Sequence, residues 1–480
     1  MDATNALEAL KDALPTSQFA LRGTDEYKAL NNGTYQSGLN ADFNPTCIFQ
    51  PKSKEEVSTF LTTIKPFVSA GQVAFAIVGS GRQPAPGCSN INDGITLNLS
   101  LLKGIDIRDG YVSIAAGERW GAVYEELGKQ GLGCAGSRSS NGGPGGLCLT
   151  GGLSIFSSRQ GFICDDVVNF EVVLASGAIV NANDSENADL WRALRGGGNN
   201  FGVVTRFDMR TFKQGPLYGG SLYYFKQSFP GQITALVNEL KKPDASDETH
   251  LMVSIGYATM FGPDPIALNQ VYHIGGVENP PVLEPFTSIE PQMPGMNTLR
   301  ILSLTDIAKE QAGEMSLPPR SAYMNTHVKA DVAMLQAGAD IFTSNLDPVK
   351  GIEGFVCSYT LQPYPRSLLE ASATKGGNSL GLNPDLGPIV SIALLLYWVN
   401  PSDDERIIST FRTILEKIEK EAITRGQEIA FKYMNYSYTF QDPIGSYGGE
   451  NKKRLQEASK KYDPEGVFQK GVPGGWKLFL

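Results

Sequence analysis

A short glycine-rich stretch at residues 78–83 could bind an anion. It reads Val78-Gly79-Ser80-Gly81-Arg82-Gln83 and follows an apolar run that starts at Val73. Glycines let the backbone adopt positive φ and approach a ligand closely, and successive exposed N–H groups in such a turn suit a pyrophosphate. Pro84 stands where a Rossmann G-x-G-x-x-G motif has its third glycine. Taken alone, the stretch is more typical of an ordinary strand-to-loop turn, so the rest of the chain decides between the two interpretations.

Two further stretches share this glycine-rich character. The first contains Gly142-Gly143-Pro144-Gly145-Gly146 and, a little later, Gly151-Gly152. The second contains Gly196-Gly197-Gly198 and is followed by Gly202. Backbone without side chains can lie directly against a cofactor. A helix C-cap also explains Gly196–Gly198, and both explanations can hold together.

Periodic patterns predict the elements that position these stretches. Ser53 and Glu56 form a capping-box pattern, which predicts a helix that runs to about Lys65, where Pro66 is expected to end it. A strand at 73–78 leads into the first stretch. Asn31-Asn32-Gly33 is assigned to polar coil. Further predicted elements are strands at 95–99, 111–114, 167–174, 178–182 and 203–207 and helices at 120–130 and 188–194.

The pattern changes after about Phe212. Glycine clusters become rarer, and longer strands alternate with long helices, as in an α+β layer. Strands are predicted at 217–225, 251–257, 267–273, 354–362 and 389–398, and helices at 231–241, 328–343 and 403–422. Because alternate strand residues share one face of a sheet, several strand residues are candidates for contact with a substrate, on a face that the sequence does not define: Tyr257, Tyr359, Gln362 and Tyr397.

Composition and charge argue against several classes of protein. The 480 residues carry 41 Lys and Arg against 50 Asp and Glu, so the formal net charge is −9, and neither nucleic acid nor an anionic membrane is an expected partner. The six cysteines contain no C-x-x-C and the three histidines have no metal-ligand spacing, so no metal site is expected. The N-terminus lacks the basic and apolar regions of a signal peptide, which predicts a cytoplasmic protein. Nothing in the sequence indicates the oligomeric state.

The order and spacing of the motifs carry a resemblance to a known family. The loop 79–87 precedes Asn92-Asp93-Gly94, and 142–152 continue into 157–162 and Asp165. There follow the run 190–205, which reads LWRALRGGGNNFGVVT, and an ending with Tyr433-Met434-Asn435-Tyr436 and 461–468. Over the whole chain this pattern resembles the berberine bridge enzyme-like FAD-linked oxidoreductases, of the vanillyl-alcohol-oxidase or PCMH type, and is most similar to fungal members.

The resemblance implies an α+β fold with a two-subdomain PCMH-type FAD-binding domain and a separate antiparallel-sheet substrate domain that carries helices on one face. The FAD-binding domain would comprise residues 1–212 and 440–480, and the substrate-binding domain residues 213–439. The pyrophosphate of FAD would lie against the first glycine-rich stretch, and the backbone near 202–204 would face the adenine. The residues implied in FAD binding are Val78, Gly79, Ser80, Gly81, Arg82, Gln83, Ser139, Gly142, Gly143, Gly145, Gly146, Gly152, Asp165, Gly202, Val204 and Asn435.

The sequence departs from the family at two positions. Many members attach FAD covalently through a histidine and often a cysteine, but these positions hold Arg82 and Ser139 here. A protonated guanidinium has no free lone pair to attack the flavin, and a serine hydroxyl is a far weaker nucleophile than a thiolate. Non-covalent FAD is therefore predicted, with attachment through Cys134 or Cys148 as the alternative. Arg82 could supply positive charge near the cofactor or face solvent without a role.

The resemblance also implies two catalytic residues. Oxidation by flavin needs hydride transfer to N5 and usually a base for the substrate's proton. Tyr433 and Asn435 match the family's Tyr-x-Asn segment, which makes Tyr433 the candidate base and Asn435 a hydrogen-bonding partner of flavin or substrate. Packing of the Tyr433 ring in the core, and a turn-forming role for Asn435, are the alternatives.

The predicted function is that of an FAD-dependent oxidase or dehydrogenase that acts on a hydrophobic small molecule, by analogy in secondary metabolism. A redox-neutral cyclase or isomerase, in which FAD has a structural role, is the alternative, and the missing covalent anchors lend it weight. A non-catalytic flavin carrier is a third possibility, which the retained Tyr433 and Asn435 disfavour.

Overall fold

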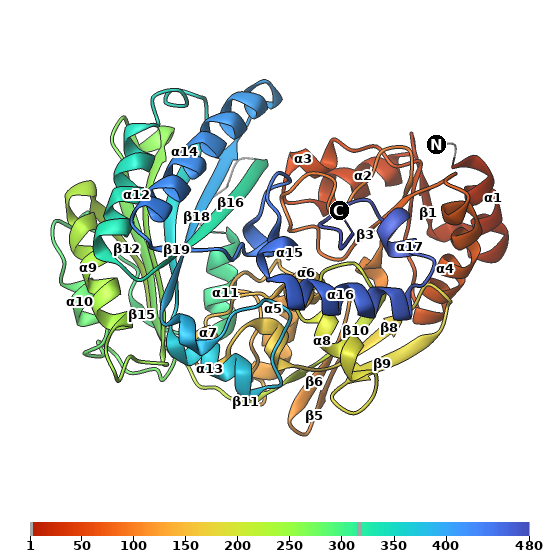
Figure 1. Cartoon of the computed structure of the whole chain (residues 1–480), viewed down its shortest axis with the longest axis horizontal. Coiled ribbons are helices and arrows are strands. Elements are labelled where there is room, and N and C mark those ends of the chain that lie inside the picture. The colour runs from red at the N-terminus through yellow and green to blue at the C-terminus, as the bar shows by residue number, and fades with distance from the viewer. Residues whose placement is uncertain (1–2, 314–318, 480) are drawn as a thin grey trace.

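The computed structural model describes residues 3–313 and 319–479, which form helices around three main sheets (Figure 1). The first sheet has strand order β1-β2-β4-β3, with β1 and β2 antiparallel and the other pairs parallel. Its strands are β1 (Phe19–Leu21), β2 (Cys47–Phe49), β3 (Phe75–Val78) and β4 (Ile95–Asn98). The helices around it are α1 (Thr4–Ala13), α2 (Asp25–Thr34), α3 (Gly38–Ala41) and α4 (Lys54–Ser69).

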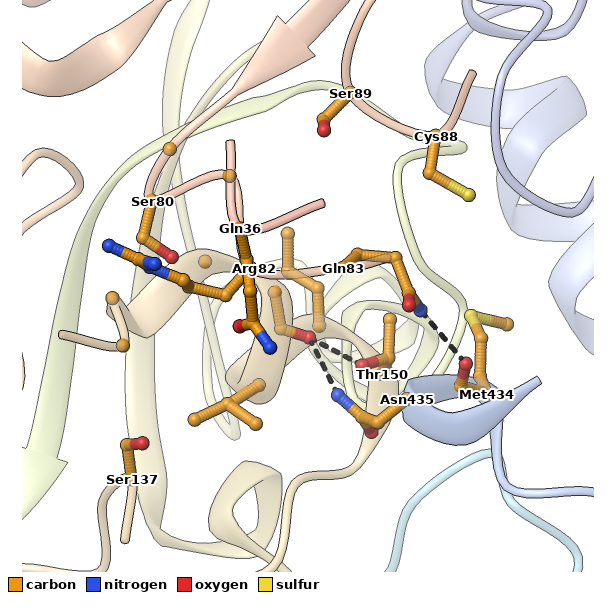
Figure 2. A pocket seen from close by; sticks show the side chains of 18 of the residues that line it. Gln36, Ser80, Arg82, Gln83, Cys88, Ser89, Ser137, Thr150, Met434 and Asn435 are labelled. Carbon is orange, nitrogen blue, oxygen red and sulfur yellow. Dashed lines mark hydrogen bonds between the residues drawn. The ribbon is translucent and has the colours of Figure 1, made fainter. Parts of the chain in front are cut away.

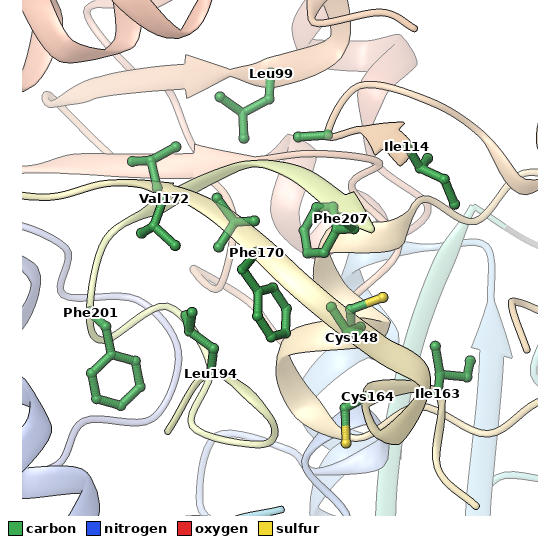
Figure 3. Packing of buried hydrophobic residues seen from close by; sticks show 14 of the residues in the cluster. Leu99, Ile114, Cys148, Ile163, Cys164, Phe170, Val172, Leu194, Phe201 and Phe207 are labelled. Atoms are coloured by element: carbon green, nitrogen blue, oxygen red, sulfur yellow. The ribbon is translucent and has the colours of Figure 1, made fainter. Parts of the chain in front are cut away.

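The second sheet is antiparallel, in the order β5-β6-β10-β8-β9. Its strands are β5 (Ile105–Arg108), β6 (Tyr111–Ala115), β8 (Val167–Val173), β9 (Ile179–Asn183) and β10 (Val203–Arg210). Its inner face packs in a core where the rings of Phe170 and Phe207 meet edge to face, with centroids 5.8 Å apart (Figure 3). The nearby helices are α5 (Trp120–Gly128), α6 (Pro144–Thr150) and α8 (Ala188–Leu194).

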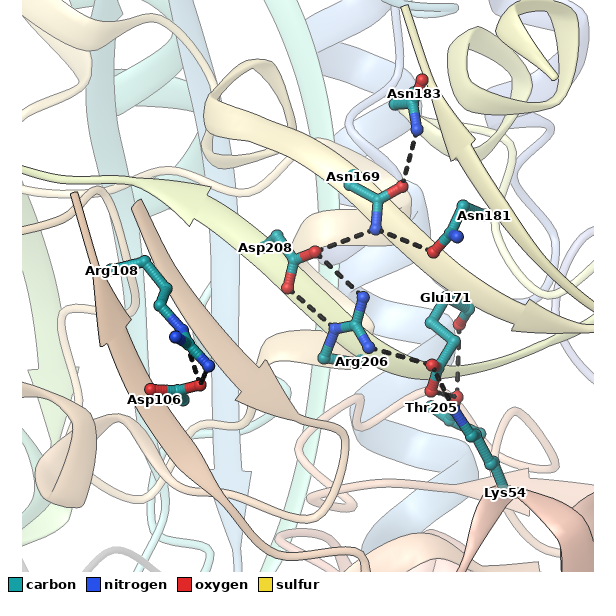
Figure 4. Close-up of polar contacts among 10 residues, drawn as sticks. All are labelled: Lys54, Asp106, Arg108, Asn169, Glu171, Asn181, Asn183, Thr205, Arg206 and Asp208. Atoms are coloured by element: carbon teal, nitrogen blue, oxygen red, sulfur yellow. Dashed lines mark hydrogen bonds and ion pairs between the residues drawn. The ribbon is translucent and has the colours of Figure 1, made fainter. Parts of the chain in front are cut away.

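The opposite face of the second sheet is polar. The guanidinium of Arg206 donates to Glu171 and to Asp208, both at 2.9 Å, and the ammonium group of Lys54 on α4 lies 2.8 Å from Glu171 (Figure 4). Inward Phe170 and outward Glu171 show the two-residue alternation of a strand with one face in the core.

The third sheet has eight strands, all antiparallel, in the order β15-β12-β14-β13-β17-β18-β16-β19. The strands are β12 (Leu217–Phe225), β13 (Thr249–Ala258), β14 (Ile266–His273), β15 (Arg300–Leu302), β16 (Arg320–Lys329), β17 (Val356–Tyr364), β18 (Ile389–Trp398) and β19 (Glu428–Ile429). Three long helices cover one face of this sheet, at the left of Figure 1: α9 (Phe229–Leu240), α12 (Val332–Ser344) and α14 (Asp404–Thr424). The predicted α+β class is confirmed.

The C-terminal helices return to the first part of the chain. α16 (Gly449–Tyr462) lies beside α8, where Lys461 forms an ion pair with Asp189 at 2.7 Å, and α17 (Val467–Lys470) packs on α4. The remaining elements are β7 (Leu132–Gly133), α7 (Ser157–Gln160), β11 (Phe212–Lys213), α10 (Glu284–Thr287), α11 (Leu304–Gly313), α13 (Arg366–Thr374) and α15 (Pro443–Ser446).

The helix predicted to end before Pro66 continues through it. α4 runs to Ser69, because its apolar stripe continues to Val68, which is buried in the core with Ile64. Pro66 faces solvent, so the carbonyl that loses its helical partner, that of Thr62, lies on the wet side of the helix. Packing of the buried face therefore outweighs the cost of the proline.

Three other assignments were wrong. Asn31-Asn32-Gly33 belongs to α2 rather than to coil, since Thr24 caps this helix and the Asn31 amide donates to the carbonyl groups of Ala41, at the end of α3, and Phe43. Strand β16 was missed, and residues 328–329 belong to it rather than to the helix predicted from 328. That helix begins only at Val332, where Asp331 is its N-cap. α6 lies inside the glycine-rich segment, where no helix was expected.

Within residues 3–313 and 319–479, no helix has the length and apolar character that a membrane span requires.

Candidate active site

A cavity of about 630 Å³ lies where the glycine-rich stretches meet the third sheet (Figure 2). One wall is the loop after β3, residues 79–83, which we call the β3 loop. The floor is formed by residues 137–150, which include α6. The opposite wall comes from β16 and β18 and from the 3₁₀ turn Met434–Tyr436. The cavity therefore joins segments that are far apart in the sequence.

Hydrogen bonds from outside fix the β3 loop while its N–H groups stay available. Nδ2 of Asn40 donates to the carbonyl oxygens of residues 83–85 at 3.1–3.3 Å. Gly81 has a φ of 66°, and a Cβ there would lie 2.5 Å from the carbonyl oxygen of Thr34, so only glycine fits. No described residue accepts a hydrogen bond from the N–H groups of residues 80–83. Consecutive unpaired N–H donors of this kind suit an anion.

The start of α6 presents bare backbone to the cavity. A Cβ at Gly146 would meet nothing within 4 Å, and one at Gly145 would meet only the Phe207 ring, at 4.0 Å. The amide of Asn435 holds this floor in place, because Nδ2 donates to the Gly146 carbonyl at 3.4 Å (Figure 2). Its Oδ1 accepts from the Gly152 N–H at 3.3 Å. A flat ligand can therefore approach the backbone here without meeting side chains.

The structure brings most of the residues predicted to bind FAD to this one cavity. It is lined by Gly79, Ser80, Gly81, Arg82, Gln83, Ser139, Gly142, Gly143, Gly145, Gly146, Gly202, Val204 and Asn435. Val78, Gly152 and Asp165 lie outside the lining. Asp165 is fully buried, where its carboxylate accepts from the Phe162 N–H at 2.8 Å and from Asn378 at 2.9 Å. Its side chain thus holds neighbouring loops together.

Tyr433 lies in the core and not in the cavity wall. Its side chain is 1% exposed and its ring packs against those of Phe162, Tyr364 and Tyr436. Burial, together with the neighbouring tyrosines Tyr364 and Tyr436, raises the pKa of its hydroxyl well above the ordinary range. A base role for Tyr433 stays a prediction. Because Tyr433 is buried away from the cavity, the structure favours Tyr436 for that role, since Tyr436 lies three residues later and lines the cavity.

Two arginines converge beside the β3 loop. Nε of Arg82 and Nη1 of Arg119 donate to the same carbonyl oxygen, that of Asn141, at 3.3 and 2.9 Å. Burial lowers the pKa of both guanidinium groups, and the charge of Arg82 lowers that of Arg119 further. Neither forms an ion pair with a described carboxylate. Two like charges this close favour a bound anion, which supports an electrostatic role for Arg82, and that role stays a prediction.

The thiols near the cavity are poorly placed to attack a cofactor. Cys134 and Cys148 are fully buried outside the lining, and burial raises the pKa of both. Cys88 does line the cavity, but burial raises its pKa to about 12, so its thiol is neutral near pH 7. Ser139 lines the cavity, and its side chain has no described base within hydrogen-bonding distance.

The third sheet supplies an aromatic wall. Tyr323 of β16 and Tyr397 of β18 line the cavity, and their hydroxyl groups lie 2.7 Å apart. Tyr397 was among the predicted substrate contacts. Tyr257 and Tyr359 point to the helical face instead, where the Tyr359 hydroxyl donates to the Leu335 carbonyl of α12 at 3.0 Å.

Sequence reasoning missed the cavity residues of β16 and two arginines, Arg119 and Arg138. Ser321 and Tyr323 lie on the strand that was not predicted, and Gln36 follows the segment taken for coil. Arg138 precedes Ser139 and reaches toward the third sheet, where it donates to Gln362 at 3.1 Å. The available signal for Arg138 was its position between Cys134 and the glycine-rich stretch that begins at Gly142.

The comparisons with known proteins agree with this architecture. Residues 45–183 match a family described as an FAD binding domain. The FAD-dependent monooxygenase tpcD of Cochliobolus heterostrophus is 36% identical over 469 residues, which cover 94% of this chain and 89% of that protein. Among solved structures, BBE-like 1 of Physcomitrella patens has a TM-score of 0.79 at 17% identity and covers 99% of both chains. A berberine bridge enzyme variant in complex with (S)-reticuline has a TM-score of 0.75 at 16% identity, over 99% of this chain and 100% of that one.

The fold and the matched FAD binding domain place this chain in the class of FAD-linked oxidoreductases with a PCMH-type fold. Within it, the chain belongs to the family of the fungal FAD-dependent monooxygenases, and its fold is that of the berberine bridge enzyme-like flavoenzymes. The cavity fits the family's cofactor: the unpaired N–H groups of residues 80–83 suit a diphosphate, and the open space above Gly145 and Gly146 leaves room for a flat ring.

Proposed function

We propose that this chain is an oxidase or dehydrogenase that holds FAD non-covalently and oxidises a hydrophobic small molecule. The observation that carries the proposal is the composition of the cavity: N–H groups and bare backbone on one side, a tyrosine wall on the other, and, among the described lining residues, no nucleophile suited to tether a flavin. The residues that would hold FAD are the β3 loop, Gly145, Gly146 and Asn435, with Arg82 and Arg119 as counter-charges to the diphosphate. Bound FAD would supply the acceptor for a hydride from the substrate.

The protein's own groups would orient the substrate and handle its proton. Tyr436 lines the cavity and accepts a hydrogen bond from Arg138, so its hydroxyl proton can be donated to, or exchanged with, a substrate oxygen. Asn435 positions the same turn on the floor of the cavity. The aromatic rings of Tyr323 and Tyr397 exclude water and favour an apolar, planar substrate.

Further parts of the proposal rest on the resemblance. The division into an FAD-binding domain (1–212 and 440–480) and a substrate-binding domain (213–439) is supported by the third sheet, whose strands all lie between Leu217 and Ile429. A role in secondary metabolism is supported by the fungal relatives. The cytoplasmic location stays a prediction.

Acid precipitation tests the attachment of FAD. Purified holoprotein is precipitated with acid, and the yellow colour is measured in the pellet and in the supernatant. Release of the flavin into the supernatant is expected. Retention in the pellet would overturn the non-covalent proposal, and a Cys88→Ser variant would then show whether the lining thiol is the anchor.

Mass spectrometry of the product tests the type of reaction. An oxidase or dehydrogenase gives a product that is lighter than the substrate by two hydrogens, and anaerobic substrate bleaches the flavin. Relatives are named monooxygenases, so oxygen from labelled O₂ in the product would favour that reaction instead. A product isomeric with the substrate, with no bleaching, would favour the redox-neutral alternative.

A further inference from the structure

The guanidinium of Arg138 lies half-buried in the cavity wall, between residues 137–143 and the third sheet. Nη1 donates to Oε1 of Gln362 on β17 at 3.1 Å and lies 2.7 Å from the sulfur of Met252 on β13. Nη2 donates to the hydroxyl of Tyr436. Arg138 therefore belongs to the substrate-facing side of the cavity, opposite the β3 loop.

All three partners of Arg138 are neutral. No Asp or Glu lines the cavity in the part of the chain that the structure describes, and Arg138 forms no ion pair there. A partly desolvated charge without a counter-charge is costly, and an amide, a thioether and a phenol compensate it only weakly. The nearby His250 responds to the same field, since burial first and Arg138 second lower its pKa to about 3. The wall thus holds a positive charge that an anion would balance.

The cofactor does not account for this charge. Arg82 and Arg119 meet at Asn141 beside the β3 loop, where two guanidinium groups match the two negative charges of a dinucleotide diphosphate. Arg138 contacts β13, β17 and the Met434–Tyr436 turn instead. Because Oε1 of Gln362 must face the donor, its Nε2 becomes a buried donor with no partner in the described residues. A second unpaired donor therefore lies beside the guanidinium, at a side chain that is buried next to the cavity lining.

The surrounding rings restrict the shape of the anion. The Tyr323 ring meets the rings of Tyr397 and Tyr436 edge to face, with centroids 5.9 and 5.7 Å apart. Such walls favour a planar aromatic body. We propose that Arg138 binds an ionised oxygen of the substrate, so that the site takes aromatic acids or phenols in their anionic form. This proposal rests on the oxidoreductase function proposed above.

Calorimetry with paired probes tests this proposal on the FAD-loaded protein. The probes are 2-naphthoate against its neutral analogue 2-naphthamide, and 4-nitrophenolate against 4-nitroanisole. The wild type is expected to bind at least one anion about ten-fold or more tighter than its neutral analogue. Arg138→Met is expected to remove that preference while the neutral probes bind within about two-fold of wild type. A preference for 2-naphthoate would indicate carboxylate substrates, and a preference for 4-nitrophenolate would indicate phenolate substrates.

Two controls keep the outcome unambiguous. Arg406→Met, at an exposed position of α14, is expected to retain the preference. FAD content and the flavin spectrum are measured for each variant, because loss of FAD in Arg138→Met would assign the arginine to the cofactor and overturn the proposal. Equal binding of anionic and neutral probes by the wild type would overturn it as well. Binding needs no turnover, so failure to oxidise any substrate would contradict the proposed function alone.

Discussion

Asn325 and Tyr433 hold each other through two reciprocal hydrogen bonds. Nδ2 of Asn325 donates to the Tyr433 carbonyl at 3.0 Å, and the Tyr433 N–H donates to Oδ1 of Asn325 at 2.8 Å. Asn325 belongs to β16 and is fully buried. This pair fixes the chain just before the Met434–Tyr436 turn, so the Tyr433 ring enters the core while Asn435 and Tyr436 reach the cavity.

Replacement of Asn325 by alanine is expected to loosen this turn. The buried N–H of Tyr433 would lose its partner, which costs roughly 1–3 kcal/mol of unfolding free energy, whereas the Tyr433 carbonyl would keep the Tyr436 N–H and the Ser437 hydroxyl as donors. Thermal unfolding should show a lower midpoint, and the FAD content of purified protein should fall. Asn5→Ala, at an exposed position of α1, is the control and should leave both unchanged. An unaltered midpoint for Asn325→Ala would show that the reciprocal pair does not stabilise the fold.

Alanine at Gly146 and at Gly143 should separate cofactor binding from folding. A Cβ at Gly146 meets nothing in the protein, so the apoprotein should keep its stability or gain up to about 1 kcal/mol from better helix propensity. The same methyl group would occupy cofactor space, so FAD should bind about ten-fold or more weakly, measured by flavin fluorescence. A Cβ at Gly143 would lie 2.8 Å from Cβ of Ser80, so Gly143→Ala should lower the unfolding midpoint instead. Unchanged FAD affinity in Gly146→Ala would contradict this position for the cofactor.

Arg82→Met should weaken FAD binding without destabilising the apoprotein. Removal of one of two like charges at Asn141 relieves their mutual repulsion, so the apoprotein should unfold at the same or a higher temperature. FAD affinity should fall by about ten-fold and depend less steeply on salt, because one attraction to the diphosphate is lost. Arg108→Met, on the exposed strand β5, serves as the control for a removed surface charge. Full FAD affinity in Arg82→Met would leave Arg82 without an electrostatic role.

Lys477 should make stability depend on pH in the alkaline range. Burial lowers its pKa to about 7, below the value of about 10.4 in an unfolded chain. Between these two values the unfolded state binds the proton that the folded state has lost, so this lysine makes the fold more stable as pH rises. Its penalty is largest, and constant, below pH 7.

Lys477→Met removes that penalty. Its unfolding midpoint relative to wild type should therefore be highest near about pH 6 and decline toward about pH 9, by the proton linkage that each unit of pKa shift implies. Lys453→Met, at an exposed position of α16, should show no such trend. A midpoint difference that grows as pH rises would contradict a lowered pKa for Lys477.

Local patterns predicted the elements well where one face of an element is buried. The strand with inward Phe170 and outward Glu171 was located from its run of β-forming residues, and the helix at 188–194 from the polar run 183–187 that opens it. The strand β16 has nearly all of its residues buried, so it lacks the alternation that marks a strand with one wet face. Pro66 was wrongly taken as the end of α4. The free-energy cost of a proline in a helix depends on whether it lies on the solvent side or on the buried side, and only the tertiary structure determines which side that is.

The candidate site was predicted in its backbone more than in its side chains. The glycines at 79, 81, 145 and 146 signalled close approach of a ligand, and all line the cavity. Tyr433 and Tyr436 lie in the same short segment, and tertiary contacts such as the pairing of Asn325 with the Tyr433 backbone position their rings, so the sequence alone did not show which ring reaches the cavity. Arg138 acquires its role through Met252 and Gln362, which are more than 100 residues away in the chain.

Along strands of the third sheet, residues that pack beneath the helices alternate with residues that line the cavity. On β18, Leu394 and Leu396 pack beneath the helices, whereas Leu395 and Tyr397 line the cavity. On β13, Val253 packs beneath the helices and Met252 lines the cavity. Mutations that alter substrate range can therefore accumulate at every second position without disturbing the helix-packed core. A variant library confined to positions 252, 323, 395 and 397 would explore new substrates on a scaffold whose stability is set elsewhere.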